Sequence, residues 1–189
     1  FDGDQLLYVI ARHRHRRNQL KGVVGTQMSN LALEQMLGAL GIAFARARVG
    51  DRYVLEMLQE KGWELGGENS GHILCLDKHT TGDGIVSALQ VLTAVCETGK
   101  PLAALAGDLK LFPQTLINVK MQKGFDWQKN AAITKAKQAV EKKLGSKGRV
   151  LLRLSGTEPV LRVMVEGENE AKVSAAAQEL ADIVKAACA

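Results

Sequence analysis

Residues 21–77 read KGVVGTQMSNLALEQMLGALGIAFARARVGDRYVLEMLQEKGWELGGENSGHILCLD, and the alternation of elements within them indicates the fold class. Short apolar runs at 21–26 and 42–48 predict buried strands, and each is followed by apolar residues at helical spacing. Two more short strands are predicted at 63–66 and 72–77, on either side of a glycine-rich loop. Strands that alternate with helices indicate an α/β unit with a mainly parallel sheet.

This first unit has four long predicted helices. Each begins at a polar side chain that can accept hydrogen bonds from the free N–H groups of the first turn. The predicted capping residues and their helices are Asp4 for 3–16, Ser29 for 29–40, Asp51 for 50–61 and Asp83 for 83–98.

The pattern changes after a short helix predicted at 102–108, and Phe112-Pro113 marks the expected domain boundary. The expected fold is α/β: an α/β/α mixed-sheet domain over 1–110, then a small α+β domain over 114–189 with an antiparallel sheet and two helices. The elements predicted for the second domain are strands at 115–121, 149–154 and 160–166 and helices at 130–144 and 169–187.

Composition excludes several classes of protein. Hydrophobic residues make up 46% and charged residues 24%, which is typical of a globular chain and not of a disordered one. No apolar run approaches the ~20 residues that span a bilayer, so we expect a soluble protein without a membrane partner. Three widely spaced cysteines fit a reducing compartment, which predicts a cytoplasmic location. A start at Phe1, inside a charged turn, indicates a piece of a longer protein.

The formal net charge is +5, and two basic clusters produce it. One lies at 12–21, and the other, at 118–149, holds nine Lys or Arg against two acidic residues. This balance favours an anionic partner such as a phosphorylated small molecule or a nucleic acid. The first cluster has no interleaved aromatic residue, and cations at a helix C-terminus are favourable in any case. A nucleic-acid-binding module is therefore the weaker alternative.

The residues from Arg153 to Arg162 form the phosphate loop, a tight turn between two predicted strands. Gly156 lets the backbone approach a ligand closely, and Ser155 and Thr157 offer hydroxyl donors. The two flanking arginines carry guanidinium forks that suit the oxygens of a phosphate group. Together they predict a site for a dianionic phosphate.

Residues 66–72, Gly-Gly-Glu-Asn-Ser-Gly-His, form a second loop, which we call the sugar loop. Glu68 can accept two hydrogen bonds and Ser70 can accept or donate, a combination that suits the vicinal hydroxyls of a sugar. His72 follows at the start of a strand, where an imidazole can move protons.

Three further segments carry weaker signals. Arg52 lies in the first turn of a predicted helix and opposes the helix dipole, which favours a ligand-binding role. Asp2-Gly3-Asp4 and Gly82-Asp83-Gly84 look like fragments of an acidic metal loop. Neither has three closely spaced carboxylates, so we interpret both as turns and helix caps and expect no metal site in this chain.

The two loops, in this order, resemble those of the α-D-phosphohexomutases. The closest likeness is to the bacterial branch that acts on glucosamine phosphates, because Gly-Glu-Asn-Ser-Gly-His at 67–72 matches its sugar loop. Val23–Asn30 and Arg46–Val54 are also similar to that branch. The resemblance covers essentially the whole chain.

The resemblance implies that residues 1–110 are the end of the family's second domain plus its third, and that 114–189 are its fourth. The phosphorylated serine and the Mg²⁺-binding loop belong to the earlier domains, which would be partners of this chain. The implied reaction interconverts glucosamine 6-phosphate and glucosamine 1-phosphate, with glucosamine 1,6-bisphosphate as the intermediate. The isolated chain is expected to be inactive.

The same resemblance implies roles for individual residues. Glu68, Asn69, Ser70 and Arg52 would bind the sugar of a hexosamine phosphate, and His72 would assist proton transfer. The residues that would hold the phosphate not being transferred are Arg153, Ser155, Gly156, Thr157 and Arg162. The alternatives left open are a phosphoglucomutase or phosphomannomutase fragment, a sugar-phosphate sensor without chemistry, and the nucleic-acid-binding module.

Overall fold

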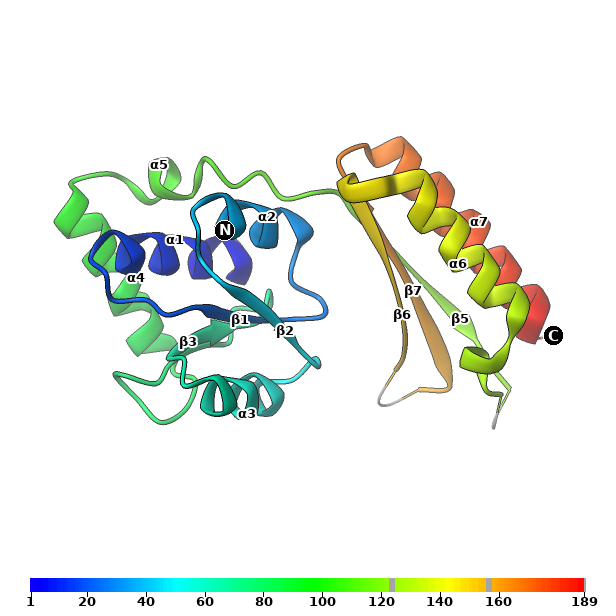
Figure 1. Cartoon of the computed structure of the whole chain (residues 1–189), viewed down its shortest axis with the longest axis horizontal. Helices are drawn as coiled ribbons and strands as arrows, with labels where there is room; N and C mark the ends of the chain where they lie inside the picture. The colour runs from blue at the N-terminus through cyan, green and yellow to red at the C-terminus, as the bar shows by residue number, and fades with distance from the viewer. Residues whose placement is uncertain (123–124, 156–157, 189) are drawn as a thin grey trace. The chain divides into compact units, whose positions relative to one another are not determined.

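The chain divides into two units, Phe1–Leu111 and Phe112–Ala189, and a four-stranded sheet organises the first (Figure 1). The computed structural model describes residues 1–122, 125–155 and 158–188. The strands of the first unit are β1 Val23–Thr26, β2 Phe44–Ala47, β3 Leu65–Gly67 and β4 Ile73–Cys75. They lie in the order β2-β1-β3-β4, with β1 parallel to both neighbours and β4 antiparallel to β3. The predicted mixed sheet is confirmed.

Helices cover both faces of this sheet. They are α1 Gly3–Arg16, α2 Leu31–Ala39, α3 Asp51–Lys61, α4 Gly84–Thr98 and the short α5 Leu102–Ala106. Figure 1 shows α1 and α4 on one side of the sheet and α3 on the other. All four residues of β1 are buried, as expected for a central strand that is covered on both faces. The first unit is therefore the expected α/β/α sandwich.

Two predicted helix caps, Asp4 and Ser29, are wrong. The cap of α1 is Asp2, whose side chain accepts a hydrogen bond from the Gln5 N–H at 3.0 Å, whereas Asp4 already lies inside the helix. Asn30, and not Ser29, caps α2. A capping residue keeps an extended backbone just before the first turn, and composition locates that residue only to within one or two positions.

Of the two remaining predicted caps of the first unit, Asp83 is confirmed and Asp51 is not. Asp83 caps α4 as predicted, because its side chain accepts from the Val86 N–H at 2.8 Å. The cap of α3 is Gly50, which has no side chain to offer, and Asp51 is the first residue of the helix. The prediction of Asp51 as a cap is therefore wrong.

The second unit is built on an antiparallel three-stranded sheet. Its strands, β5 Gln114–Lys120, β6 Gly148–Leu154 and β7 Val160–Gly167, lie in the order β5-β7-β6. Two helices, α6 Ala131–Leu144 and α7 Glu170–Cys188, pack on one face of the sheet, as Figure 1 shows. Short 3-10 turns, η1 Trp127–Lys129 and η2 Gly145–Lys147, flank α6. The predicted small α+β domain is confirmed.

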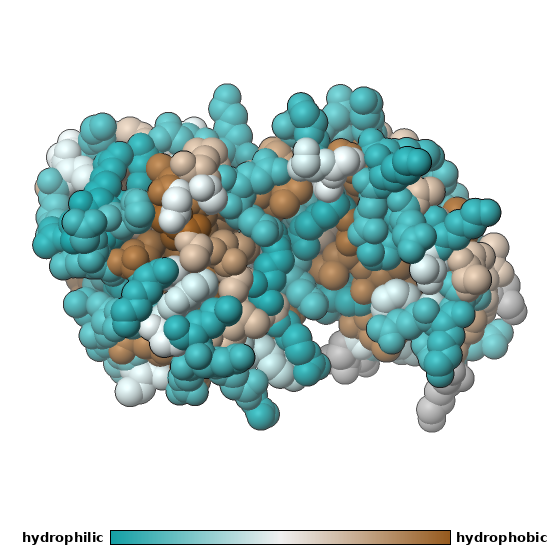
Figure 2. All heavy atoms as spheres, viewed as in Figure 1, coloured by the Kyte–Doolittle hydropathy of each residue, from teal (hydrophilic) through white to brown (hydrophobic). Residues whose placement is uncertain are grey.

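Apolar stripes of α6 and α7 form the core of the second unit together with the sheet. The fully buried side chains that pack against the sheet include Val173, Leu180 and Val184 of α7 and Ile133 of α6. Among the described residues, no helix is long and apolar enough to span a membrane. Hydrophilic side chains dominate the face drawn in Figure 2.

Candidate functional site

The candidate site of the first unit lies at the edge of the sheet where the parallel strands β1, β2 and β3 end. The chain leaves this edge in three loops, which begin with Gln27, Arg48 and Glu68. In open α/β sheets, ligands bind at the carboxyl ends of the strands, where such loops converge. The sugar loop therefore follows β3 at the edge where a binding site is expected.

The sugar loop is closed by its own backbone. The Glu68 N–H donates to the His72 carbonyl oxygen at 2.9 Å, and the Gly71 N–H donates to the Glu68 carbonyl oxygen at 3.0 Å. This turn keeps Glu68 and Asn69 half-buried and leaves Ser70 and His72 exposed. The four predicted residues of the loop, Glu68, Asn69, Ser70 and His72, thus lie in one tight turn.

Two glycines from elsewhere in the first unit support the loop. The backbone N–H of Gly50 donates to Glu68 Oε1 at 2.9 Å, and that of Gly3 donates to the Asn69 carbonyl oxygen at 2.9 Å. A Cβ atom on Gly3 would stand 2.2 Å from the Glu68 carbonyl oxygen, so only glycine fits there. The Asp2-Gly3-Asp4 segment is a support of the loop as well as a helix start.

Arg52 is not brought to the sugar loop. Its guanidinium pairs with Glu56 one turn along α3, at 2.8 Å, and its side chain is 80% exposed. The hydrogen bond and charge of Glu56 raise the pKa of Arg52. Arg48, which sequence reasoning did not select, follows β2 at the binding edge and stacks over the Tyr53 ring at 4.3 Å. The sequence feature that could have pointed to Arg48 is its position directly after a predicted strand.

A separate candidate site lies in the second unit, where Arg153 of β6 and Arg162 of β7 are direct cross-strand partners. We call these two residues the arginine pair. Directly opposed residues share a face of the sheet, so two like charges stand side by side. Both Nε atoms are buried and have no hydrogen-bond partner in the described part of the chain. Burial and the charge of Arg162 lower the pKa of Arg153.

Ser155 joins the arginine pair. Its hydroxyl accepts a hydrogen bond from Arg162 at 3.3 Å, and its backbone N–H closes the hairpin by donating to the Val160 carbonyl oxygen at 3.0 Å. Gly156 and Thr157 lie outside the described residues. Asn118, which sequence reasoning missed, is the partner of Arg162 on β5 and shares the face of the arginine pair. The signal in the sequence was the alternation along 114–120, which sets polar Asn118 opposite in facing to apolar Ile117 and Val119.

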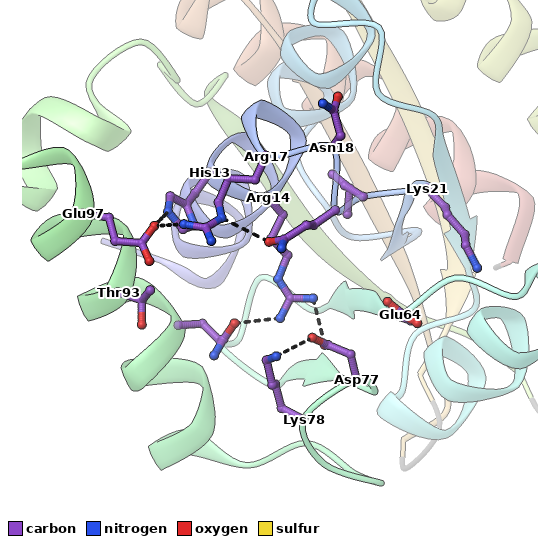
Figure 3. Close-up of a pocket in the computed structure, with 13 residues that line it drawn as sticks. His13, Arg14, Arg17, Asn18, Lys21, Glu64, Asp77, Lys78, Thr93 and Glu97 are labelled. Atoms are coloured by element: carbon purple, nitrogen blue, oxygen red, sulfur yellow. Dashed lines mark hydrogen bonds and ion pairs between the residues drawn. The ribbon is translucent and has the colours of Figure 1, made fainter.

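A hollow of about 540 Å³ lies at the opposite edge of the first sheet, before β1 and β3 begin (Figure 3). Several of its charged groups are paired, since Arg14 contacts Asp77 at 2.9 Å and both His13 and Arg17 contact Glu97. Part of the first basic cluster is therefore neutralised within the unit. This pairing leaves less charge there for the phosphates of a nucleic acid.

The described residues do not include a group of three or more His, Cys, Asp or Glu side chains that could hold a metal ion.

Two family models match the chain. The model described as phosphoglucomutase/phosphomannomutase, alpha/beta/alpha domain III, matches residues 2–112, and that described as phosphoglucomutase/phosphomannomutase, C-terminal domain, matches 116–183. Phosphoglucosamine mutase of Dechloromonas aromatica is 62% identical over 185 residues, covering 98% of this chain and 41% of the relative. That of Nitrosospira multiformis is 59% identical over 190 residues and covers 100% and 41%. The chain thus spans about two fifths of the length of these relatives.

Solved structures share the fold. N-acetylphosphoglucosamine mutase of Aspergillus fumigatus, in complex with GlcNAc-6P and magnesium, matches with a TM-score of 0.79 at 18% identity, covering 97% of this chain and 47% of that one. A variant of the fungal enzyme in complex with glucose 1,6-bisphosphate matches with a TM-score of 0.78 at 20% identity, covering 99% and 44%. At this level of identity the likeness concerns the fold alone.

Proposed function

The chain belongs to the phosphoglucomutase/phosphomannomutase family, and from that premise we propose that it is the substrate-binding C-terminal portion of a phosphoglucosamine mutase. The whole enzyme would interconvert glucosamine 6-phosphate and glucosamine 1-phosphate, in the supply of amino-sugar precursors in the cytoplasm. Residues 1–110 would be the end of domain two with domain three, and 114–189 domain four. The lengths and identities of the relatives support this reading.

One observation carries the proposal: the arginine pair. Two guanidinium groups stand on neighbouring strands, and each has a buried Nε without a partner in the described residues. A buried donor without an acceptor is costly, and two adjacent cations repel each other. A phosphate dianion would satisfy both groups at once, because its oxygens accept from guanidinium forks. The site is thus built for an anion of the kind that a sugar phosphate carries.

The sugar loop of the first unit would contribute a second element of recognition. Glu68 would accept hydrogen bonds from sugar hydroxyls, and Ser70 and Asn69 would add a hydroxyl and an amide. His72 has an imidazole without a hydrogen-bond partner in the described residues, so it is available to hold or pass a proton. Arg52 is the weakest member of the proposed set, because Glu56 already occupies its guanidinium.

The division of labour follows from these groups. Holding the phosphate that is not transferred orients the sugar, and orientation accounts for much of the rate of phosphoryl transfer. Equal grip on a phosphate at either end of the sugar would let a bisphosphorylated intermediate bind in both directions. The phosphorylated serine and the Mg²⁺ ligands would come from the N-terminal domains. The isolated chain is therefore expected to bind but not to turn over substrate.

The test is a calorimetric titration of this chain with glucosamine 6-phosphate, glucose 6-phosphate and inorganic phosphate. We expect the amino sugar phosphate to bind most tightly and the Arg153→Ala variant to bind none of the three measurably. Equal affinity for glucose 6-phosphate would favour a phosphoglucomutase. A folded chain that binds no phosphate compound would contradict the proposal, as would mutase turnover by the pure chain.

A further inference from the structure

The carboxylate of Glu68 is held by a backbone group that lies far from it in the sequence. Gly50 N–H donates to Glu68 Oε1 at 2.9 Å, across 18 residues. Gly50 follows β2 and Glu68 follows β3, and these two strands lie on opposite sides of β1. The hydrogen bond therefore bridges the carboxyl edge of the sheet, over the end of the central strand.

The conformation of Gly50 is available to glycine alone. Its φ is +125° and its ψ 133°, a region that side-chain-bearing L residues essentially do not occupy. A Cβ atom there would also press on the Tyr53 ring, at 3.3 Å from Cδ2. The direction of the Gly50 N–H thus depends on the absence of a side chain. Gly50 is also the N-cap of α3, and a helix N-terminus favours a carboxylate placed against it.

The hydrogen bond occupies only one oxygen of Glu68. The other, Oε2, has no hydrogen-bond partner within the described ranges 1–122, 125–155 and 158–188. Holding Oε1 with a neutral N–H fixes the rotamer of Glu68 and leaves its negative charge uncompensated. A carboxylate prepared in this way accepts hydrogen bonds from a ligand without first losing rotational freedom.

We infer that Gly50 is a positioning residue for substrate recognition: it acts through Glu68 by aiming Oε2 at the sugar hydroxyls of the bound hexosamine phosphate. This inference rests on the proposed function. It explains why a helix of 11 residues begins at a glycine without a side-chain cap, where Asp, Ser or Asn would serve the helix better. Gly50 gives α3 no side-chain cap, but its N–H positions the Glu68 carboxylate.

The test compares Gly50→Ala, Glu68→Ala and the double variant with a matched control, Gly62→Ala. Gly62 ends the same helix with φ +63°, and a Cβ there meets open space, so this variant introduces left-handed strain without touching the sugar loop. Calorimetry gives the affinity for glucosamine 6-phosphate and for inorganic phosphate. Thermal unfolding shows that each variant is folded.

We expect Gly50→Ala to lower the affinity for glucosamine 6-phosphate about tenfold, because one hydrogen bond is lost and one side chain is freed. The affinity for inorganic phosphate should not change. In the Glu68→Ala background, Gly50→Ala should add less than about twofold, because the two residues act as one unit. Gly62→Ala should lower the melting temperature and leave both affinities unchanged.

A second readout does not depend on the substrate. In NMR spectra, Glu68→Ala should move the Gly50 amide proton upfield, because a hydrogen bond to a carboxylate oxygen deshields the donor proton. A Gly50 amide proton that does not respond to Glu68→Ala, or additive losses in the double variant, would overturn the inference alone. Absence of binding by the wild-type chain would overturn the proposed function, and this inference with it.

Discussion

The backbone N–H of Gly3 donates a hydrogen bond to the carbonyl oxygen of Asn69 at 2.9 Å, so the first turn of α1 rests on the sugar loop. Gly3 is buried, and the loop backbone fills the space that a side chain would need. The start of α1 and the sugar loop are therefore one structural element. A substitution at Gly3 should therefore alter the conformation of the sugar loop, and a substitution in the loop should alter the start of α1.

Gly3→Ala should damage the sugar loop. The new Cβ would lie 2.2 Å from the Glu68 carbonyl oxygen and 2.5 Å from the Gly71 nitrogen, both backbone atoms that cannot turn aside. We expect at least a tenfold loss of affinity for glucosamine 6-phosphate and about 1–3 kcal/mol lower free energy of unfolding. The matched control is Gly84→Ala, at the first position of α4, where a Cβ meets open space. Unchanged affinity in Gly3→Ala would refute the coupling.

Arg153→Met should abolish phosphate binding without destabilising the fold. Burial and Arg162 already lower the pKa of Arg153, so removal of its charge relieves repulsion while the stem volume is kept. The free energy of unfolding should equal or exceed that of the wild type. Arg149→Met is the contrast, because Arg149 pairs with the fully buried Glu166 and its loss should cost about 3 kcal/mol. Chemical denaturation and phosphate titration check both variants.

Asn118→Ala should weaken phosphate binding by about 2- to 10-fold, the value of one neutral hydrogen bond. Asn118 is the β5 partner of Arg162, and its exposed side chain shares the face of the arginine pair. Leu116→Ala serves as the control, since Leu116 lies on the same strand and face but has no polar group. Equal affinity of the two variants would remove Asn118 from the site.

Asp4→Asn should change how stability depends on pH. Burial raises the pKa of Asp4 from 3.8 to about 6, so the folded protein holds a proton that the unfolded chain releases between these values. The contribution of the protonated form is complete below pH 3.8 and is lost as the pH rises through about 6. Relative to the variant, the free energy of unfolding of the wild type should fall by roughly 3 kcal/mol over this pH window.

Urea unfolding at several pH values from 4 to 7.5 measures this difference. The Asn30 N–H donates to Asp4 Oδ2 at 2.7 Å, and an asparagine oxygen at residue 4 can accept the same bond. The two free energies should therefore converge at low pH and run parallel above pH 6.5. Parallel curves across the whole range would show that Asp4 does not titrate in this window.

Local sequence patterns were enough to predict the architecture and the two loops. Alternation of apolar runs and helical stripes predicted the mixed sheet, and the stripe of Val173, Leu180 and Val184 became the core of the second unit. Glycine-rich and arginine-flanked turns identified the sugar loop and the phosphate loop. These properties are local, because periodicity and turn chemistry act over a few neighbouring residues.

Which charges are neutralised and which stay available depends on the packing of the folded chain. Arg12 and Arg14 look alike in the sequence to Arg153 and Arg162, but the first two pair with Asp108 and Asp77, acids that are 96 and 63 residues away. Strand register, and not spacing, set Arg153 against Arg162 and put Asn118 beside them. The hold of Gly50 on Glu68 likewise depends on two loops meeting above β1. Such pairings are decided by how strands and helices pack, because packing brings together groups that are remote along the chain.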